Sequence, residues 1–512
     1  MAAATHNVAT PVMTAVPSHL RGRIVSGMRW TFWLSAIGVP FSYGITIVLA
    51  RAGTEVIGTF GLLMVYIGLV ASLFYLGGDS VIIKFVPELN TEQRLSFLVS
   101  YLLIVLGFMG FCLGIAVVWP LSLQYLFGNR GGARFQFQML CLSPVYVLFS
   151  LVVAAHKAVL EMRWAQMLMR ALTIGSFLLY TALYLGWRSA LNNHYTGLIW
   201  GTYLGLTAVA TGVGLRHLLR MQEWSSDWGK MRLFLPRGFW HYLLTTEEVS
   251  LVGFLMQRLD LILIMNLGGL SMLGKYVAVV TVAGSIGAAN RLFVDTLLPS
   301  LTNTISTGNV DAVSQVVTVN LRLLFLFNLA GMGAMMSLTD PILHFLGHDY
   351  GDLRSPFILL VLFIGLAAPG AIGGTLLSAV SKLQHVFWVY VAQLISFVTL
   401  FAILWQRWHI LGAILANGVS VLGASVLLLA VAKWNSGIKF AVYADYFMFS
   451  CVGSAAGAVL LHWKVARLGL DLLVWTTFLA VFLLARKYSL KECKQLIGCF
   501  APSSFGLMRA EP

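Results

Sequence analysis

Three arginines lie inside long apolar runs of the sequence, where a charge is unusual. Arg170, Arg258 and Arg291 each interrupt a stretch of predominantly hydrophobic residues. A charged side chain at the centre of a bilayer costs about 2.5–3.5 kcal/mol on insertion scales, so it indicates a function by default. A guanidinium group is suited to bidentate contact with phosphate oxygens. Arg258 and Arg291 therefore predict recognition of a phosphate group, whereas Arg170 can reach the membrane surface from its place in the run.

The run over residues 276–298 has one small and polar face. Its members follow one another at spacings of three or four, which brings them to one side of a helix: Thr281, Gly284, Ala288, Arg291 and Asp295. Asn290 adds a hydrogen-bonding group beside this face. One interpretation is a cationic, hydrated cavity wall. The alternative is an Arg291–Asp295 pair at i,i+4 that stabilises the helix near its cytoplasmic end.

The run over residues 242–266 carries four charged residues. Glu247 and Arg258 are eleven residues apart and share a helical face, whereas Asp260 points elsewhere. Glu247 and Glu248 are candidates for binding a coupling proton or Na⁺, because a carboxyl group in a dehydrated cavity is costly to keep charged. Alternatively, they are acids in the first turns of a helix, where the helix dipole favours them.

Other polar residues predict less specific roles. Arg51, at the end of the first apolar run, is either a phosphate contact at a cavity mouth or an ordinary interfacial arginine. Asp79 and Lys84 are expected to form a surface pair. No metal site or cofactor is predicted: His344 and His348 flank a turn, the five cysteines lack CxxC spacing, and no phosphate-binding Gly-x4-Gly-Lys-[Ser/Thr] loop is present.

The composition indicates that these residues belong to a membrane protein. Of 512 residues, 59% are hydrophobic and 10% are charged, where a soluble chain has about 25% charged residues. The mean hydropathy is +0.85. The net charge of +14 does not indicate nucleic-acid binding, because the basic residues stand in small groups between apolar segments.

The hydropathy pattern predicts an all-α, polytopic fold with about fourteen membrane-spanning helices. A span needs about 20 apolar residues. The expected spans are 30–50, 57–78, 96–120, 137–156, 165–186, 196–215, 242–266, 276–298, 321–342, 356–379, 384–405, 410–432, 445–463 and 469–485. They form two pseudo-symmetric six-helix lobes, followed by a helix pair. The predicted parts are a tail (1–27), a first lobe (28–220), a linker (221–240), a second lobe (241–435), helices 13 and 14 (436–488) and a second tail (489–512).

The basic residues also predict the orientation of the chain. If the amino terminus is cytoplasmic, 21 of the 33 lysines and arginines fall in cytoplasmic segments and 9 on the opposite side. This bias favours both termini inside and an even number of spans.

A repeat relates the two predicted lobes. The segments that enter the second and eighth spans both read Gly-x4-Gly-x-aromatic, from Gly53 to Phe60 and from Gly269 to Tyr276, at an offset of 216 residues. Six spans separate the two segments, so the lobes would share one orientation, as parallel repeats do in transporters.

Several segments of the sequence together match the pattern of a known family: 49–61, Gly77-Gly78-Asp79, Phe85-Val86-Pro87-Glu88, 258–263, 273–276, 377–382 and 411–416. At these residues the chain resembles polysaccharide-export flippases (Wzx-like), of the multidrug/oligosaccharidyl-lipid/polysaccharide exporter superfamily. The resemblance covers about residues 28–435 and departs where Ser381 stands before Lys382, since the family often has Gly-Lys or Gly-Arg at this loop.

The resemblance implies a flippase, not an enzyme, in the inner (plasma) membrane. It would move a polyprenyl-pyrophosphate-linked oligosaccharide by alternating access, for exopolysaccharide, capsule or O-antigen biosynthesis. The expected partners are this substrate, membrane lipid, and a polysaccharide polymerase with export machinery, with no nucleic acid. The cavity residues would be Arg51, Arg258, Asn290 and Arg291, and the coupling or ion-pair residues Glu247, Glu248, Asp260 and Asp295.

Two alternative functions remain open. A cation-coupled multidrug exporter would favour an acidic, aromatic cavity, whereas the intramembrane charges here include three arginines. A membrane polysaccharide polymerase or glycosyltransferase would need a long outer loop, and the predicted outer loops are short.

Overall fold

The computed structural model describes residues 18–118, 133–221, 224, 233–287, 290, 310–380 and 382–436. All regular structure in these residues is helical, which confirms the predicted all-α class. Predicted helices 13 and 14, the carboxyl-terminal tail, residues 1–17, Arg291 and Asp295 lie outside the described residues. Residues 18–27, predicted as part of the amino-terminal tail, are helical.

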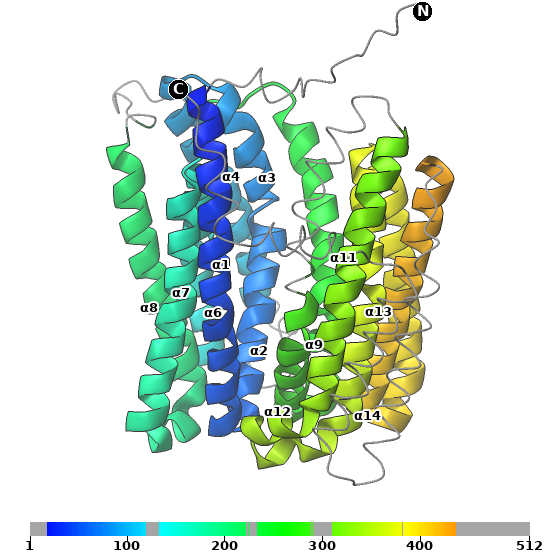
Figure 1. The fold of residues 1–512 in the computed structure, drawn as a ribbon. Coiled ribbons are helices and arrows are strands. Elements are labelled where there is room, and N and C mark those ends of the chain that lie inside the picture. Colours follow the sequence, from blue (N-terminus) through cyan, green and yellow to red (C-terminus); the bar gives the residue numbers. More distant parts are fainter. Residues whose placement is uncertain are drawn as a thin grey trace, which may run out of the picture. The chain divides into compact units, whose positions relative to one another are not determined.

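The amino-terminal part consists of long helices joined by short connections (Figure 1). Helix α2 continues directly into a five-residue π-helix, η2. The elements are α1 (Ser18–Ala52), α2 (Thr54–Leu69), η2 (Val70–Phe74), α3 (Gly78–Phe85), η3 (Val86–Glu88), α4 (Thr91–Val118), α6 (Ala133–Ala158), α7 (Met162–Gly186) and α8 (Arg188–Arg220).

Two helices in the remaining part each join two predicted spans through a kink. Helix α9 (Phe239–Ala283) bends at Gly269, where φ is 78°. Helix α14 (Leu383–Ser436) bends at His409, where φ is 43°. The other elements are α11 (Val310–Ser337), α12 (Thr339–Leu346), η6 (His348–Leu353) and α13 (Arg354–Ala379).

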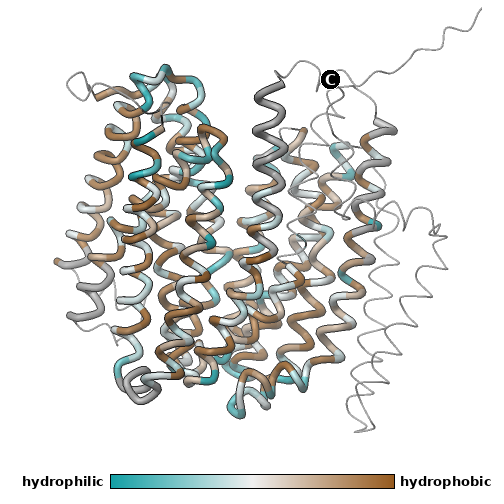
Figure 2. The backbone as a smooth tube through the Cα atoms, turned by 60° about the vertical axis from the view of Figure 1, so that its left-hand side comes forward, coloured by the Kyte–Doolittle hydropathy of each residue, from teal (hydrophilic) through white to brown (hydrophobic). Residues whose placement is uncertain are grey.

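The first twelve predicted spans each overlap a helix. Within the described residues, eight helices are long and apolar enough to cross a membrane, and two of these run through the kinks of α9 and α14. Hydrophobic residues occupy most of the helix lengths, and hydrophilic residues gather toward the helix ends (Figure 2). Large apolar side chains such as Leu178 and Trp388 are 57% and 60% exposed, as expected for a surface that faces lipid.

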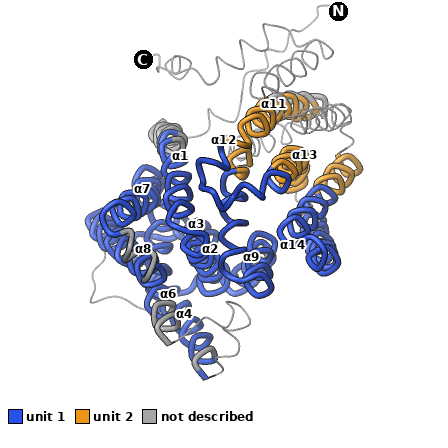
Figure 3. The backbone as a smooth tube through the Cα atoms, turned by 90° about the horizontal axis from the view of Figure 1, so that it is seen from below, with its two compact units in different colours: residues 1–282, 342–357, 383–424 blue, residues 283–341, 358–382, 425–512 orange. Residues whose placement is uncertain are grey.

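The chain divides into two compact units (Figure 3). The first unit comprises residues 1–282, 342–357 and 383–424, and the second comprises 283–341, 358–382 and 425–512. In the first unit, α1 packs on α7, α6 on α8, and α3 on α6. In the second, α13 packs closely on the end of α14, because Gly370 and Gly373 leave room for Ser425 and the backbone of Leu428. The predicted lobe boundaries at 28–220 and 241–435 stay predictions.

The helix over the second predicted span, 57–78, ends at Phe74, and a break at residues 75–77 separates it from α3. The π-helix η2 ends before Leu76 and Gly77, whose φ angles are 49° and 62°. The Tyr101 hydroxyl donates to the carbonyls of Tyr75 and Leu76, which satisfies backbone groups that the break releases. Glycine suits the left-handed conformation at residue 77, so the Gly77-Gly78 pair is the local reason for the break.

The two Gly-x4-Gly segments of the repeat meet each other in the first unit. A Cβ at Gly58 would collide with the carbonyl oxygen of Leu270, and a Cβ at Gly274 would collide with that of Thr54. The two contacts are reciprocal, because each glycine and each carbonyl is related to its counterpart by the same offset of 216 residues. The repeat glycines therefore permit the close crossing of α2 and α9.

Candidate functional site

A polar cavity of about 430 Å³ lies among the helices of the first unit. The broken segment between η2 and α3 forms one wall, and α6, α7 and α8 form the others. Its volume falls within the range of about 300–1,000 Å³ that is typical of small-molecule sites. The residues that give the cavity its chemistry are Tyr75, Asp79, Tyr146, Ser150, Lys157 and Tyr203. We call it the N-terminal cavity.

An ion pair lies in the wall of this cavity. The Lys157 Nζ atom is 2.7 Å from Asp79 Oδ2, and the two side chains are 20% and 50% exposed. Asp79 thus pairs with Lys157 of α6, whereas the predicted partner, Lys84, lies over the Tyr242 ring at 3.9 Å from its centroid. Among the described residues that line the cavity, Asp79 and Lys157 alone carry a charge, so the lining is neutral overall.

Three tyrosines bring aromatic surface and hydroxyl groups to the cavity. The Tyr75 hydroxyl is buried and has no hydrogen-bond partner in the part of the chain that the structure describes. The ring of Tyr75 lies against Gly78, where a Cβ would collide with it. Tyr146 hydrogen-bonds Ser150 one turn further along α6. A buried hydroxyl without a partner favours a ligand or water in this space.

Arg258 lies on α9 and faces α2. A Cβ placed on Gly68 of α2 would be 3.5 Å from Arg258 Nε. Ala71, three residues after Gly68, lines the N-terminal cavity. The predicted intramembrane arginine therefore contacts a segment that continues into the wall of this cavity.

The two glutamates at the start of α9 have different surroundings. Glu248 is exposed, whereas both carboxyl oxygens of Glu247 are buried and have no hydrogen-bond partner among the described residues. The preceding residue, Thr246, packs against Gly77 at the break between η2 and α3. An unpaired carboxylate at such a place is costly, and a bound proton or cation would offset that cost.

Asp260 is buried and well paired. Its Oδ2 accepts a hydrogen bond from the Tyr276 hydroxyl at 2.7 Å, and Asn417 Nδ2 lies 3.5 Å from the same oxygen. Its Oδ1 accepts the backbone N–H of Leu261 at 2.8 Å. Tyr276 is the aromatic residue of the second Gly-x4-Gly-x-aromatic segment, so the repeat contributes directly to this cluster.

Arg51 and Asn290 lie in local contacts. Arg51 Nε donates to the carbonyl of Phe345 at 2.9 Å, and its guanidinium lies 4.7 Å from the centre of the Phe345 ring. Asn290, in the second unit, exchanges two amide hydrogen bonds with Asn328, at 3.0 and 2.9 Å. These contacts hold Arg51 against α12 and Asn290 against α11. The roles predicted for both residues, and for Arg291 and Asp295, stay predictions.

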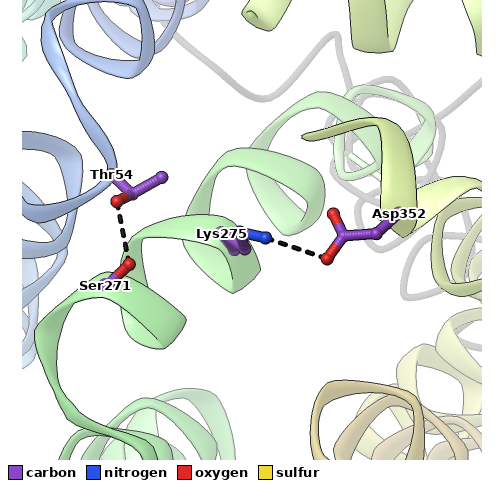
Figure 4. Close-up of polar contacts among 4 residues, drawn as sticks. All are labelled: Thr54, Ser271, Lys275 and Asp352. Atoms are coloured by element: carbon purple, nitrogen blue, oxygen red, sulfur yellow. Dashed lines mark hydrogen bonds and ion pairs between the residues drawn. The ribbon is translucent and has the colours of Figure 1, made fainter. Parts of the chain in front are cut away.

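Polar contacts join the repeat segments to their neighbours at the start of α2 (Figure 4). Thr54 Oγ1 and Ser271 Oγ are 2.8 Å apart, and both residues follow the positive-φ glycines of the repeat. Lys275 Nζ is 2.8 Å from Asp352 Oδ2 of η6. These contacts link α2, α9 and η6 at one end of the first unit.

Sequence reasoning missed the N-terminal cavity and the pairing of Asp79 with Lys157. The Gly77-Gly78 pair was a usable signal, because two consecutive glycines within an apolar run predict an interruption. The pairing itself joins residues 78 positions apart, and no local pattern specifies it.

The comparisons with known proteins identify the fold. No protein-family model matches the chain, and no curated protein matches it in sequence. Among solved structures, the lipid II flippase MurJ in an inward closed conformation matches 88% of this chain and 97% of its own length, with a TM-score of 0.66 and 13% identity. An inward-facing multidrug resistance MATE family transporter of the MOP superfamily matches 78% of this chain and 94% of its own, with a TM-score of 0.60 and 15% identity.

The chain shares the fold of these two solved structures. An outward-facing MATE family structure also matches, over 81% of this chain and 95% of its own, with a TM-score of 0.55 and 14% identity. With this fold and its long apolar helices, the chain is a multi-pass membrane protein. At these identities the likeness establishes the fold, and the substrate has to be inferred from the site.

Proposed function

We propose that the chain is a flippase that moves a polyprenyl-pyrophosphate-linked oligosaccharide from the inner to the outer leaflet of the inner (plasma) membrane. The observation that carries this proposal is the position of Arg258, within an apolar helix and against Gly68, three residues before the cavity-lining Ala71. The pyrophosphate is the charged part of such a lipid, so it needs a cationic partner inside the membrane. A guanidinium group can bind phosphate oxygens through two hydrogen bonds. The fold shared with a lipid II flippase supports the same substrate class.

In this proposal the polyprenyl tail stays in lipid while the polar head crosses through the protein. Arg258, together with Arg291, binds the pyrophosphate. Alternating access between two related lobes moves the head from one side to the other, as in transporters built from repeats. A proton or Na⁺ gradient drives the cycle through Glu247, whose buried carboxyl oxygens have no hydrogen-bond partner in the described residues. The product then passes to a polysaccharide polymerase and export machinery for surface polysaccharide synthesis.

A second candidate function is a cation-coupled multidrug exporter, which the likeness to MATE family transporters supports. Capture of a cationic drug needs net negative charge in the binding cavity. In the N-terminal cavity the charge of Asp79 is offset by Lys157. The residues that line the cavity therefore carry no net negative charge to attract a cationic drug, which favours the flippase over the exporter.

A reconstitution experiment separates the two functions. The full chain is inserted into liposomes that contain a fluorescent polyprenyl-pyrophosphate-linked saccharide, and a membrane-impermeant reagent reports the fraction in the outer leaflet. We expect the chain to speed equilibration of this lipid under an imposed proton or Na⁺ gradient, and to leave a cationic dye in place. Export of the dye without movement of the lipid would contradict the proposal and favour the exporter.

A further inference from the structure

We propose that the N-terminal cavity binds a neutral sugar, and that it holds the glycan part of the lipid-linked substrate. The inference rests on the proposed function for the identity of the ligand, but the cavity itself is defined by residues of η2, α3, α6, α7, α8 and α9 and of the segment between η2 and α3. Three properties of the cavity carry it: the balance of charge, the kind of polar groups, and the segment of α2 and η2 that it shares with Arg258.

The balance of charge excludes the pyrophosphate from this cavity. Lys157 is the only cation among the described residues that line it, and Asp79 already neutralises it at 2.7 Å. A phosphate bound to Lys157 would meet the Asp79 carboxylate, because the two charged atoms are in direct contact. A cationic ligand would meet the ammonium group in the same way. A neutral ligand avoids both penalties.

The polar groups match those of a sugar. A sugar hydroxyl both donates and accepts hydrogen bonds, and the ion pair offers an acceptor in Asp79 and further donors on the Lys157 ammonium. The Tyr75 hydroxyl is buried without a partner in the described part of the chain, so it has a hydrogen bond to make. Aromatic surface from Tyr146 and Tyr203 can cover the C–H faces of a sugar ring. A hydrocarbon ligand would leave these polar groups unsatisfied.

The cavity adjoins the segment that Arg258 contacts. Arg258 Nε lies 3.5 Å from the Cβ position of Gly68, and Ala71, three residues further along the chain, lines the cavity. Ser250 of α9 lines the cavity too, and precedes Arg258 by eight residues, about 12 Å along the helix. A lipid-linked sugar carries its pyrophosphate directly beside its first sugar ring, so one head group can occupy both places.

Binding of free sugars tests the cavity apart from lipid transport. Saturation-transfer NMR on the full chain in detergent uses glucose, galactose, mannose and N-acetylglucosamine as probes, with inorganic phosphate as the anionic comparison. We expect a signal from at least one sugar, and a drop of about tenfold in Ser150→Trp, which fills the cavity, and in Asp79→Asn, which keeps its shape but removes the carboxylate. Inorganic phosphate should give no signal that depends on Ser150.

Two matched variants control for general damage. Leu178→Trp adds the same ring on the exposed face of α7, and Asp352→Asn makes the same change in the Lys275–Asp352 pair, which lies outside the cavity. Both should keep the sugar signal. If Ser150→Trp does not fold, the comparison of Asp79→Asn with Asp352→Asn decides the question, because asparagine has nearly the same shape as aspartate.

The inference is overturned if no sugar binds to the wild-type chain, or if binding is the same in Ser150→Trp and Asp79→Asn. Its failure is distinct from failure of the proposed function. Sugar binding that depends on Ser150, with no lipid movement in liposomes, would keep the cavity and reject the flippase. Lipid movement without such binding would support the flippase and reject the sugar site in the cavity.

Discussion

The carboxylates of α9 differ in the partners that surround them, and this difference decides which of them can exchange a cation. Asp260 accepts hydrogen bonds from Tyr276 and the backbone of Leu261, so its charge is compensated in place. The carboxyl oxygens of Glu247 are buried without such donors among the described residues. A carboxylate that binds and releases an ion in each transport cycle needs oxygen atoms that are not already occupied by hydrogen-bond donors. Glu247 is therefore the better coupling candidate.

We expect Glu247→Gln to weaken gradient-driven transport while substrate binding stays largely intact, because the amide keeps the shape but cannot bind a proton. The measurement is the dependence of lipid movement on pH and Na⁺ in liposomes. Glu248→Gln, at an exposed neighbouring position, is the comparison and should change this dependence little. Unchanged dependence on pH and Na⁺ in both variants and in the double variant would remove these glutamates from the mechanism.

Arg258 should matter through both its charge and its shape. Arg258→Ala removes a hydrogen bond to a charged group, which costs about 1.5–3 kcal/mol, so substrate affinity should fall roughly 10- to 150-fold. Arg258→Lys keeps the charge but loses the planar guanidinium, so it should retain part of the function. Glycan export, normalised to membrane-inserted protein, measures both variants, alone and with the same changes at Arg291. Normal export per molecule in the double-alanine variant would refute the role of this pair.

At the scale of elements, the crossing of α2 and α9 depends on two glycines of the repeat. Gly58 and Gly274 each lie against a backbone carbonyl of the other helix, where neither side can move without shifting a whole helix. In membranes the close packing of helices relies on small residues, because lipid offers little hydrophobic drive for association. The crossing also holds Thr54 beside Ser271. The repeat is thus a packing device as well as a trace of internal symmetry.

Gly274→Ala should destabilise the full chain by about 1–3 kcal/mol, since the added methyl group collides with the Thr54 carbonyl. Gly253→Ala, in the same helix, is the matched control: nothing lies within 4 Å of its Cβ position, so it should be neutral or slightly stabilising. Thermal unfolding in detergent compares the two. Equal melting temperatures for both variants would mean that the crossing tolerates an extra methyl group.

At the scale of the whole molecule, the charge distribution predicts how the chain crosses the membrane. With 21 basic residues on one side and 9 on the other, both termini and the 216–240 loop should be cytoplasmic. Reporter fusions after residue 240 and after Pro512 test this, and both should report the cytoplasm. A signal from the opposite side at either position would overturn the orientation.

The class of protein and most of its described helices could be predicted from the amino-acid sequence, although part of the predicted span 276–298 lies outside the described residues. Both follow from hydropathy, which is a property of each segment alone, since a helix in lipid must be apolar over about 20 residues. The same local argument singled out Arg258 and Glu247, because a charge within an apolar run is costly wherever the run lies. The Gly-x4-Gly repeat could also be recognised in the sequence, but its role in the crossing of α2 and α9 could not be predicted.

The contacts between distant residues could not be predicted from the sequence and are known from the folded structure. The pairing of Asp79 with Lys157, the contact of Asp260 with Tyr276 and Asn417, and the reciprocal contact of Gly58 and Gly274 join positions far apart in the chain. Hydropathy cannot predict such pairs, because in lipid every apolar helix surface is equally well solvated. The choice of partners is made by small residues, backbone breaks and single polar contacts, and these act only once the helices have packed.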